Sequence, residues 1–107
     1  MILESYINGH WVKGDDSNTR NMYDAITGDV IGLTSTEGLD IASALQFGRD
    51  NGKALRDMTF QQRGNMIKKL ALYLNKRKEQ FYEISYKTGA TRADSWVDIE
   101  GGFGNLF

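Results

Sequence analysis

Acidic side chains near the C-terminus are the first residues whose type and spacing could support chemistry. Asp94, Asp98 and Glu100 include a pair four residues apart, which one face of a helix would present together. Carboxylates held side by side can act as general acid and base. The dipole at a helix N-terminus also attracts acidic residues, and we favour that structural role for these three.

Metal and nucleophile chemistry have little material in this sequence. His10 is the single histidine, between Gly9 and Trp11, with no further ligands at helical or strand spacing, so we expect a structural or surface role for it. The 107 residues contain no cysteine, which excludes disulfides, thiolate metal ligands and a cysteine nucleophile among them. We therefore predict no catalytic, cofactor-binding or metal-binding residue within residues 1–107.

A glycine-rich run, Gly101-Gly102-Phe103-Gly104, has the composition of a phosphate-binding loop. It lacks the dinucleotide and P-loop spacings, and no predicted strand leads into it. Propensity alone predicts a loop here, because each glycine inside a helix costs about 0.8–1 kcal/mol. The alternative is a helix whose missing Cβ atoms allow close approach of another element.

Charge is sorted along the chain. Residues 53–78 carry eight basic and one acidic residue, whereas the segments before and after them are net negative by five and three charges. Within this basic segment lies the run "KKLALYLNKRK", residues 68–78. A solvated helix face is the favoured interpretation, and an anionic small-molecule partner is the alternative. We expect no nucleic-acid binding, since leucines rather than exposed aromatic residues separate the basic residues.

The first third of the chain predicts strands, over about residues 4–34. Asn8-Gly9 between β-favouring residues predicts a hairpin over 4–13 with a type I′ turn. A loop is predicted at 14–18, and a second extended pair, 21–24 and 30–34, flanks a turn at 27–29.

The remainder predicts helices, over about residues 39–107. Apolar residues three and four apart indicate a helix from 39 to about 51. Thr59 and Gln62 form a capping box, which starts a helical stripe of Ile67, Leu70, Leu74, Phe81 and Ile84. This stripe is either one long helix or two collinear helices that meet near Asn75. Gly89 predicts a helix stop, and Thr91 with Asp94 predicts the next start.

The fold class predicted for these elements is α+β, with N-terminal β-hairpins followed by three or four helices. No proline, repeat or low-complexity segment divides the chain, which is one domain or part of one. No apolar run approaches the roughly 20 residues of a membrane helix, and the N-terminus has no signal-peptide pattern. We expect a cytoplasmic protein without a membrane partner.

Several sequence motifs, and their order along the chain, resemble the N-terminal segment of the aldehyde dehydrogenase superfamily. "YINGHWVKG" is similar to its opening hairpin, and residues 39–91 are similar to its first helices and Thr-Gly stop. "TSTEGLD", "ALRDMTF" and "TGATRADSWVDIEGGFGNLF" resemble the bifunctional ring-opening aldehyde dehydrogenase/hydratase proteins of phenylacetate degradation. Ala90-Thr91-Arg92 stand where most aldehyde dehydrogenases have a proline, which favours this branch.

The resemblance implies a parent α/β aldehyde dehydrogenase fold, in which residues 1–107 form the incomplete N-terminal part of the cofactor-binding domain. The catalytic cysteine, general-base glutamate, oxyanion asparagine and glycine-rich cofactor turn of that family lie downstream, without counterparts here. It also implies NADP or NAD as cofactor, oxidation of a semialdehyde linked to coenzyme A through a cysteine thioester, and a homo-oligomer. The last stretch is then a helix that continues beyond Phe107.

Two expectations follow from this resemblance. The basic residues would help attract the phosphates of coenzyme A: Lys68, Lys69, Lys76, Arg77 and Lys78. Apolar side chains at the end of the chain would lack their partners, so that the segment alone self-associates, exchanges helices with a second copy or stays partly molten: Trp96, Phe103, Leu106 and Phe107. The alternative function is a non-catalytic helical interaction module with an anion-binding basic face.

Overall fold

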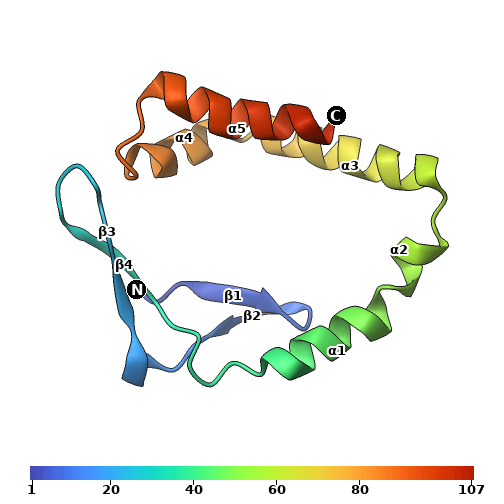
Figure 1. Cartoon of the computed structure of the whole chain (residues 1–107), viewed down its shortest axis with the longest axis horizontal. Coiled ribbons are helices and arrows are strands. Elements are labelled where there is room, and N and C mark those ends of the chain that lie inside the picture. Colours follow the sequence, from blue (N-terminus) through green and yellow to red (C-terminus); the bar gives the residue numbers. More distant parts are fainter. The chain divides into compact units, whose positions relative to one another are not determined.

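The computed structural model describes residues 1–107 as two compact units. The first consists of Met1–Asp24 and Gly28–Arg56, and the second of Ala25–Thr27 and Asp57–Phe107. Strands precede helices along the chain (Figure 1), so the predicted α+β class is confirmed.

The first unit opens with a β-hairpin of β1 (Glu4–Ile7) and β2 (His10–Lys13). Its turn residues have positive φ angles, 52° at Asn8 and 82° at Gly9. A type I′ turn requires this conformation at both central residues, which Asn and Gly adopt more readily than other residues. The hairpin predicted from Asn8-Gly9 is therefore confirmed, and Ile7 pairs with His10 directly beside the turn.

A second antiparallel pair joins β3 (Arg20–Tyr23) and β4 (Val30–Thr34), with a bulge between Met22 and Tyr23. The N-terminal residues extend this pair in a parallel direction, since the Leu3 amide donates to the Leu33 carbonyl at 2.8 Å. No pattern in the sequence predicted that addition. Before β3, the predicted loop contains the short 3-10 helix η1 (Asp16–Asn18), which the Asp15 carboxylate caps.

Helix α1 (Ile41–Asn51) starts two residues later than predicted, because Asp40 is its N-cap. The Asp40 carboxylate accepts a hydrogen bond from the Ser43 amide at 2.9 Å. The Ser43 hydroxyl accepts another from the Asn8 side chain at 3.0 Å, which attaches the helix to the hairpin turn. The five-residue helix α2 (Lys53–Asp57), which was not predicted, follows α1.

In the second unit, α3 (Phe60–Asn75) and α4 (Lys78–Tyr86) are separate helices, which confirms the two-helix alternative. The capping box of Thr59 and Gln62 starts α3 as predicted. The helical path is interrupted at Arg77, whose φ of −113° and ψ of 12° lie outside the helical region. After α4, Gly89 adopts a positive φ of 85° and ends the segment, as predicted.

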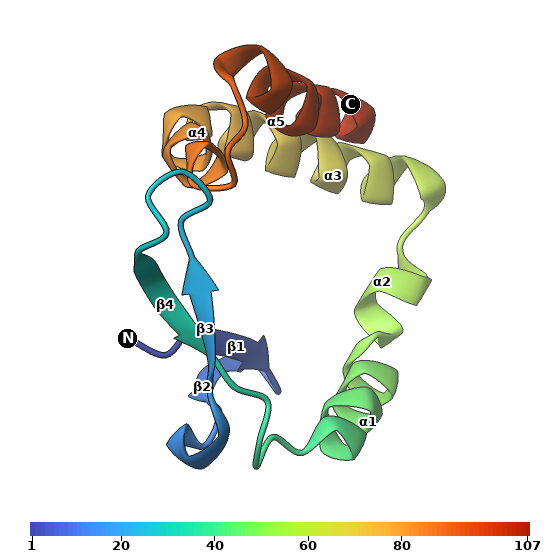
Figure 2. The ribbon, with the colours of Figure 1, turned by 60° about the vertical axis from the view of Figure 1, so that its left-hand side comes forward.

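Helix α5 (Arg92–Leu106) runs back along α4 and α3 in the opposite direction (Figures 1 and 2). It begins at the predicted capping box of Thr91 and Asp94 and passes through Gly101–Gly104. The loop that propensity predicted there is wrong, and the helix implied by the family resemblance is confirmed. The close approach of another element to these glycines is not seen, because a Cβ atom at Gly101, Gly102 or Gly104 would meet nothing within 4 Å. Tertiary contacts on both sides of the glycines, described below, outweigh the low propensity.

The packing of α5 also shows that one expectation was wrong, because Phe103, expected to lack a partner, has one. The ring of Phe103 lies edge-on to that of Phe81 on α4, with 5.6 Å between ring centroids. Trp96 and Phe107 remain exposed, as expected. The well-buried residues of the unit are few, and Ala71, Tyr82 and Ser95 form its centre.

Much of the apolar surface of α3 and α4 is therefore uncovered. The exposed large apolar residues of these two helices are Phe60, Met66, Ile67, Leu70, Leu72, Tyr73 and Ile84. None of the helices in the chain combines the length and the apolar character needed to cross a membrane.

Candidate functional site

The predicted basic residues lie in the second half of α3 and at its junction with α4. Lys68 and Lys69 belong to α3, Lys76 is its C-cap, and Arg77 and Lys78 begin α4. The structure thus brings the five residues to one part of the second unit, but it gives them different surroundings.

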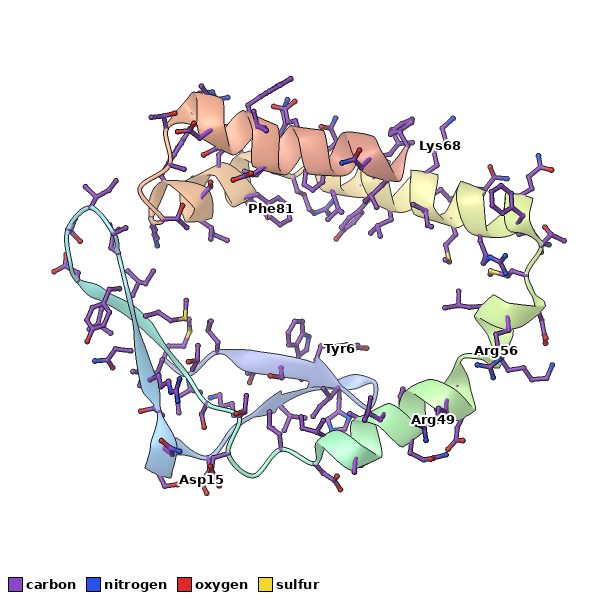
Figure 3. All side chains as sticks on the ribbon, viewed as in Figure 1. Tyr6, Asp15, Arg49, Arg56, Lys68 and Phe81 are labelled. Carbon is purple, nitrogen blue, oxygen red and sulfur yellow. The ribbon has the colours of Figure 1, made fainter.

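Three of these basic residues have partners within the unit. Lys78 forms an ion pair with Glu100 of α5, with 3.0 Å between Nζ and Oε2. The guanidinium of Arg77 stacks on the Tyr73 ring, 3.7 Å from its centroid. Lys68 lies over the Phe107 ring at 5.4 Å, beside the end of α5 (Figure 3). These contacts give Lys68, Arg77 and Lys78 structural roles.

Lys69 and Lys76 have neither an ion pair nor a side-chain hydrogen bond, and both are exposed. Their spacing of seven residues places them on the same side of α3, two turns apart. That side also carries Gln62 and Asn65 and is bordered by the exposed Met66 and Tyr73. Ile67, Ala71 and Leu74 lie on the opposite side of the helix.

A polar cluster joins α4 to α5, and Glu100 is at its centre. The Glu100 carboxylate accepts hydrogen bonds from the Tyr82 hydroxyl at 2.8 Å and from Lys78 at 3.0 Å. These two donors, Tyr82 first, hold the pKa of Glu100 below its usual range. Burial and the hydrogen bond to Glu100 raise the pKa of Tyr82 to about 12. Tyr82 therefore keeps its proton near neutral pH and is a hydrogen-bond donor rather than a base.

Arg92, at the start of α5, extends this cluster. Its guanidinium lies 4.4 Å from the centroid of the Tyr82 ring and donates to the Tyr86 hydroxyl at 3.1 Å. A longer ion pair, 3.4 Å, joins it to Glu79. The hydroxyls of Ser85 and Ser95 share a further hydrogen bond of 2.8 Å. The cluster connects the two helices and presents no side chain suited to nucleophilic attack.

The role at a helix N-terminus that we favoured for the three carboxylates applies to Asp94 alone, because Asp98 and Glu100 lie beyond the first turn of α5. Asp94 accepts hydrogen bonds from the hydroxyl and amide of Thr91, which hold its pKa below the usual value. Glu100 binds Tyr82 and Lys78, and Asp98 is exposed. The link to Glu100 was missed, although the spacing of Lys78 and Tyr82, one helical turn, is a signal that could have suggested it.

Replacing Tyr82 by phenylalanine should reduce the loss of folding stability that occurs as the pH rises from 10 toward 12. Because folding raises the pKa of Tyr82 from 10.0 to about 12, its protonated form stabilises the fold fully below pH 10 and loses this effect as pH rises toward 12. The urea midpoint of the unaltered chain should therefore fall over this interval more steeply than that of Tyr82→Phe. Tyr73→Phe, at an exposed tyrosine, is the matched control. Parallel profiles for the chain and Tyr82→Phe would contradict the assignment.

The remaining candidates from the sequence are His10 and the glycine run of α5. His10 is exposed, and its Nδ1 lies 3.1 Å from the Asn8 carbonyl oxygen. No group of three or more His, Cys, Asp or Glu side chains converges as metal ligands. Gly101–Gly104 lie inside α5, so their amides belong to the helix rather than to a loop open to a phosphate. The glycine run therefore does not form the phosphate-binding loop that its composition suggested.

The first unit has a polar hollow of about 320 Å³. Its lining residues are Asn18, Arg20, Thr34, Ser35, Thr36 and Glu37. They include no pairing of a nucleophile with a base, so the hollow has no recognisable catalytic geometry.

Comparison with known proteins gives two matches. A family model described as "Aldehyde dehydrogenase family" matches residues 11–106. A 3,4-dehydroadipyl-CoA semialdehyde dehydrogenase from Aromatoleum evansii is 31% identical over 103 residues, which cover 94% of this chain and 20% of that protein. The chain thus spans about a fifth of the length of the curated relative that it matches.

Proposed function

The chain belongs to the aldehyde dehydrogenase family, and from this membership we propose that it is the N-terminal, non-catalytic part of an NAD(P)-dependent aldehyde dehydrogenase. The observation that carries the proposal is the family match, which runs almost from end to end of the chain. In this proposal residues 1–107 complete and cover the cofactor-binding domain of a longer protein.

The cofactor, NAD or NADP, would be held by residues outside this chain. The glycine-rich run that could have cradled a phosphate is the interior of α5, and no other glycine cluster follows a strand and opens a helix. We accordingly assign no step of hydride transfer to any residue between 1 and 107. The proposed reaction of the whole protein is oxidation of an aldehyde to an acid.

The proposed substrate is a semialdehyde linked to coenzyme A. The name of the relative from Aromatoleum evansii contains such a substrate, and the identity of 31% supports a similar one here. The motif resemblance to ring-opening enzymes adds the proposal that the parent acts in phenylacetate breakdown, with ring hydrolysis in a second, hydratase-type domain. We further propose a cytoplasmic homo-oligomer.

Within the parent, the role of this segment is structural. Met66, Leu70 and Tyr73 leave one side of α3 apolar and exposed, and Trp96 does the same on α5. Contiguous apolar surface of this kind normally contacts protein. We propose that the remainder of the dehydrogenase domain covers these sides. The family match supports this assignment over a free-standing helical interaction module with an anion-binding face.

The proposal is tested by comparing the 107-residue chain with the protein encoded by the full reading frame. The longer protein should reduce NAD or NADP in the presence of a CoA-linked semialdehyde, and the chain alone should reduce neither above the buffer rate. The frame should also encode a cysteine after a glycine-rich run. Aldehyde-dependent reduction by the chain alone, or a stop codon directly after Phe107, would refute the proposal.

A further inference from the structure

We propose that Lys69 and Lys76 are the members of the basic run that attract the phosphate groups of coenzyme A. This inference rests on the proposed function, and it narrows the sequence prediction of five basic residues to two. It assigns a binding role to the two lysines that flank Tyr73 on α3, at the edge of the apolar side that the rest of the domain is proposed to cover.

The contacts of the five residues carry this selection. Lys78 is neutralised by Glu100 at 3.0 Å, and 34% of its side chain is exposed. The Arg77 guanidinium lies over the Tyr73 ring, 3.7 Å from its centroid, and also donates to the carbonyl of that residue at 3.4 Å. Binding a phosphate at either would require giving up an existing contact. Lys69 and Lys76 have no partner to give up.

The geometry of these two lysines suits an anion that carries separate phosphate groups. Seven residues of helix correspond to a separation of about 10 Å along the axis of α3. Long, flexible lysine side chains on one side of the helix can reach two phosphates of one ligand. Coenzyme A offers a 3′-phosphate and a pyrophosphate on one adenosine unit.

The surrounding charge favours the same ligand. Residues 53–78 have a net charge of +7, whereas the flanking segments are negative. A local excess of positive charge raises the concentration of anions near the surface, and salt screens the effect over about 8 Å at physiological ionic strength. Lys68 lies one residue before Lys69 and adds to this field while it remains over the Phe107 ring.

Of the two lysines, Lys76 also has a structural role that could explain its positive charge, and Lys69 does not. It is the C-cap of α3, where the helix dipole favours a cation. If Lys76 had only that role, its replacement would change the stability of the protein and would alter the kinetics of every substrate equally. The binding role predicts an effect that depends on the phosphates of the substrate, so the two can be separated by kinetics.

The test uses the full-length dehydrogenase with Lys69→Gln and Lys76→Gln combined. A CoA-linked semialdehyde is compared with its pantetheine thioester, which lacks the adenosine phosphates. We expect KM for the CoA substrate to rise about two- to tenfold, as exposed charge pairs allow, with no change for the pantetheine thioester. The difference should shrink as salt is added. Lys13→Gln with Lys87→Gln removes the same charge at exposed positions elsewhere and is the matched control.

A second measurement does not depend on turnover. Binding of adenosine 3′,5′-bisphosphate to the same protein, followed by calorimetry, should weaken in the Lys69/Lys76 variant and stay unchanged in the control. Equal effects on both thioesters, unchanged bisphosphate binding, or an equal effect of the control variant would each overturn the inference. A wild-type protein that binds the bisphosphate through these lysines but oxidises no aldehyde would instead refute the proposed function.

Discussion

Replacing Gly14 by alanine is expected to destabilise the first unit by about 2–4 kcal/mol, from overpacking together with a weakened hydrogen bond. Gly14 is buried, and a Cβ atom at this position would lie 2.7 Å from the carbonyl carbon and 2.8 Å from the hydroxyl oxygen of Ser35, with the carbonyl oxygen closer still. Backbone atoms cannot rotate away as the end of a long side chain can.

Ser35 is also held in place by its own hydrogen bonds. Its hydroxyl donates to the Asp15 carbonyl at 2.6 Å and accepts from the Glu37 amide at 3.3 Å. The Asp15 amide in turn donates to the Glu37 carbonyl at 2.8 Å. A shift of Ser35 large enough to admit a Cβ atom would disturb this junction between the two loops.

Gly48 provides the matched control for this substitution. It lies in α1, and a Cβ atom there would meet nothing within 4 Å. Gly48→Ala should therefore stabilise the chain by up to about 1 kcal/mol, through helix propensity alone. The measurement is the urea midpoint of both variants at one protein concentration. A midpoint for Gly14→Ala within error of the unaltered chain would show that the loops can separate at little cost.

The second large effect concerns the 107-residue chain by itself, which should self-associate. Ile84 on α4, Trp96 near the start of α5 and Phe107 at its end are 63%, 57% and 67% exposed. Burial of a large apolar side chain contributes roughly 1.5–3 kcal/mol, so several together are comparable to the 5–15 kcal/mol stability of a whole domain. A second copy of the chain can supply the missing contacts.

Light scattering over a dilution series measures this effect directly. The weight-average mass should rise with concentration, and Leu70→Gln combined with Ile84→Gln should shift that rise to higher concentrations. Leu70 and Ile84 are exposed, so the substitutions should leave the helical content unchanged. A monomer of 12.1 kDa at every concentration, with a sharp melt, would show that the chain is a self-sufficient domain.

The features predicted correctly are those that short stretches of sequence determine. Asn8-Gly9 fixes its turn because both residues tolerate positive φ, and Thr59 and Thr91 cap helices through residues three positions away. The glycines of α5 show the opposite case. Propensity predicted a loop there, because the contacts of Phe103 with Phe81 are not visible in a local window.

In the candidate site, too, local features could be predicted from the sequence and long-range contacts could not. The sequence located the basic run, since charge is visible residue by residue. It could not distinguish Lys78 from Lys76, because the partner of Lys78 is 22 residues away in the sequence. The addition of the N-terminal residues to β4 was missed for the same reason, as the pairing of Ile2 with Leu33 is long-range.

Hydrogen exchange, compared between the 107-residue chain and the full-length protein, tests most directly whether this segment is an integral part of a dehydrogenase domain. If the remainder of the domain covers α3 and α5, the amides around Leu70, Tyr73 and Trp96 should exchange roughly 100-fold more slowly in the full-length protein, since local opening would then expose additional buried surface. Amides around Gly48 in α1 serve as the internal reference. Equal exchange rates at Leu70, Tyr73 and Trp96 in the two proteins would contradict the proposed role.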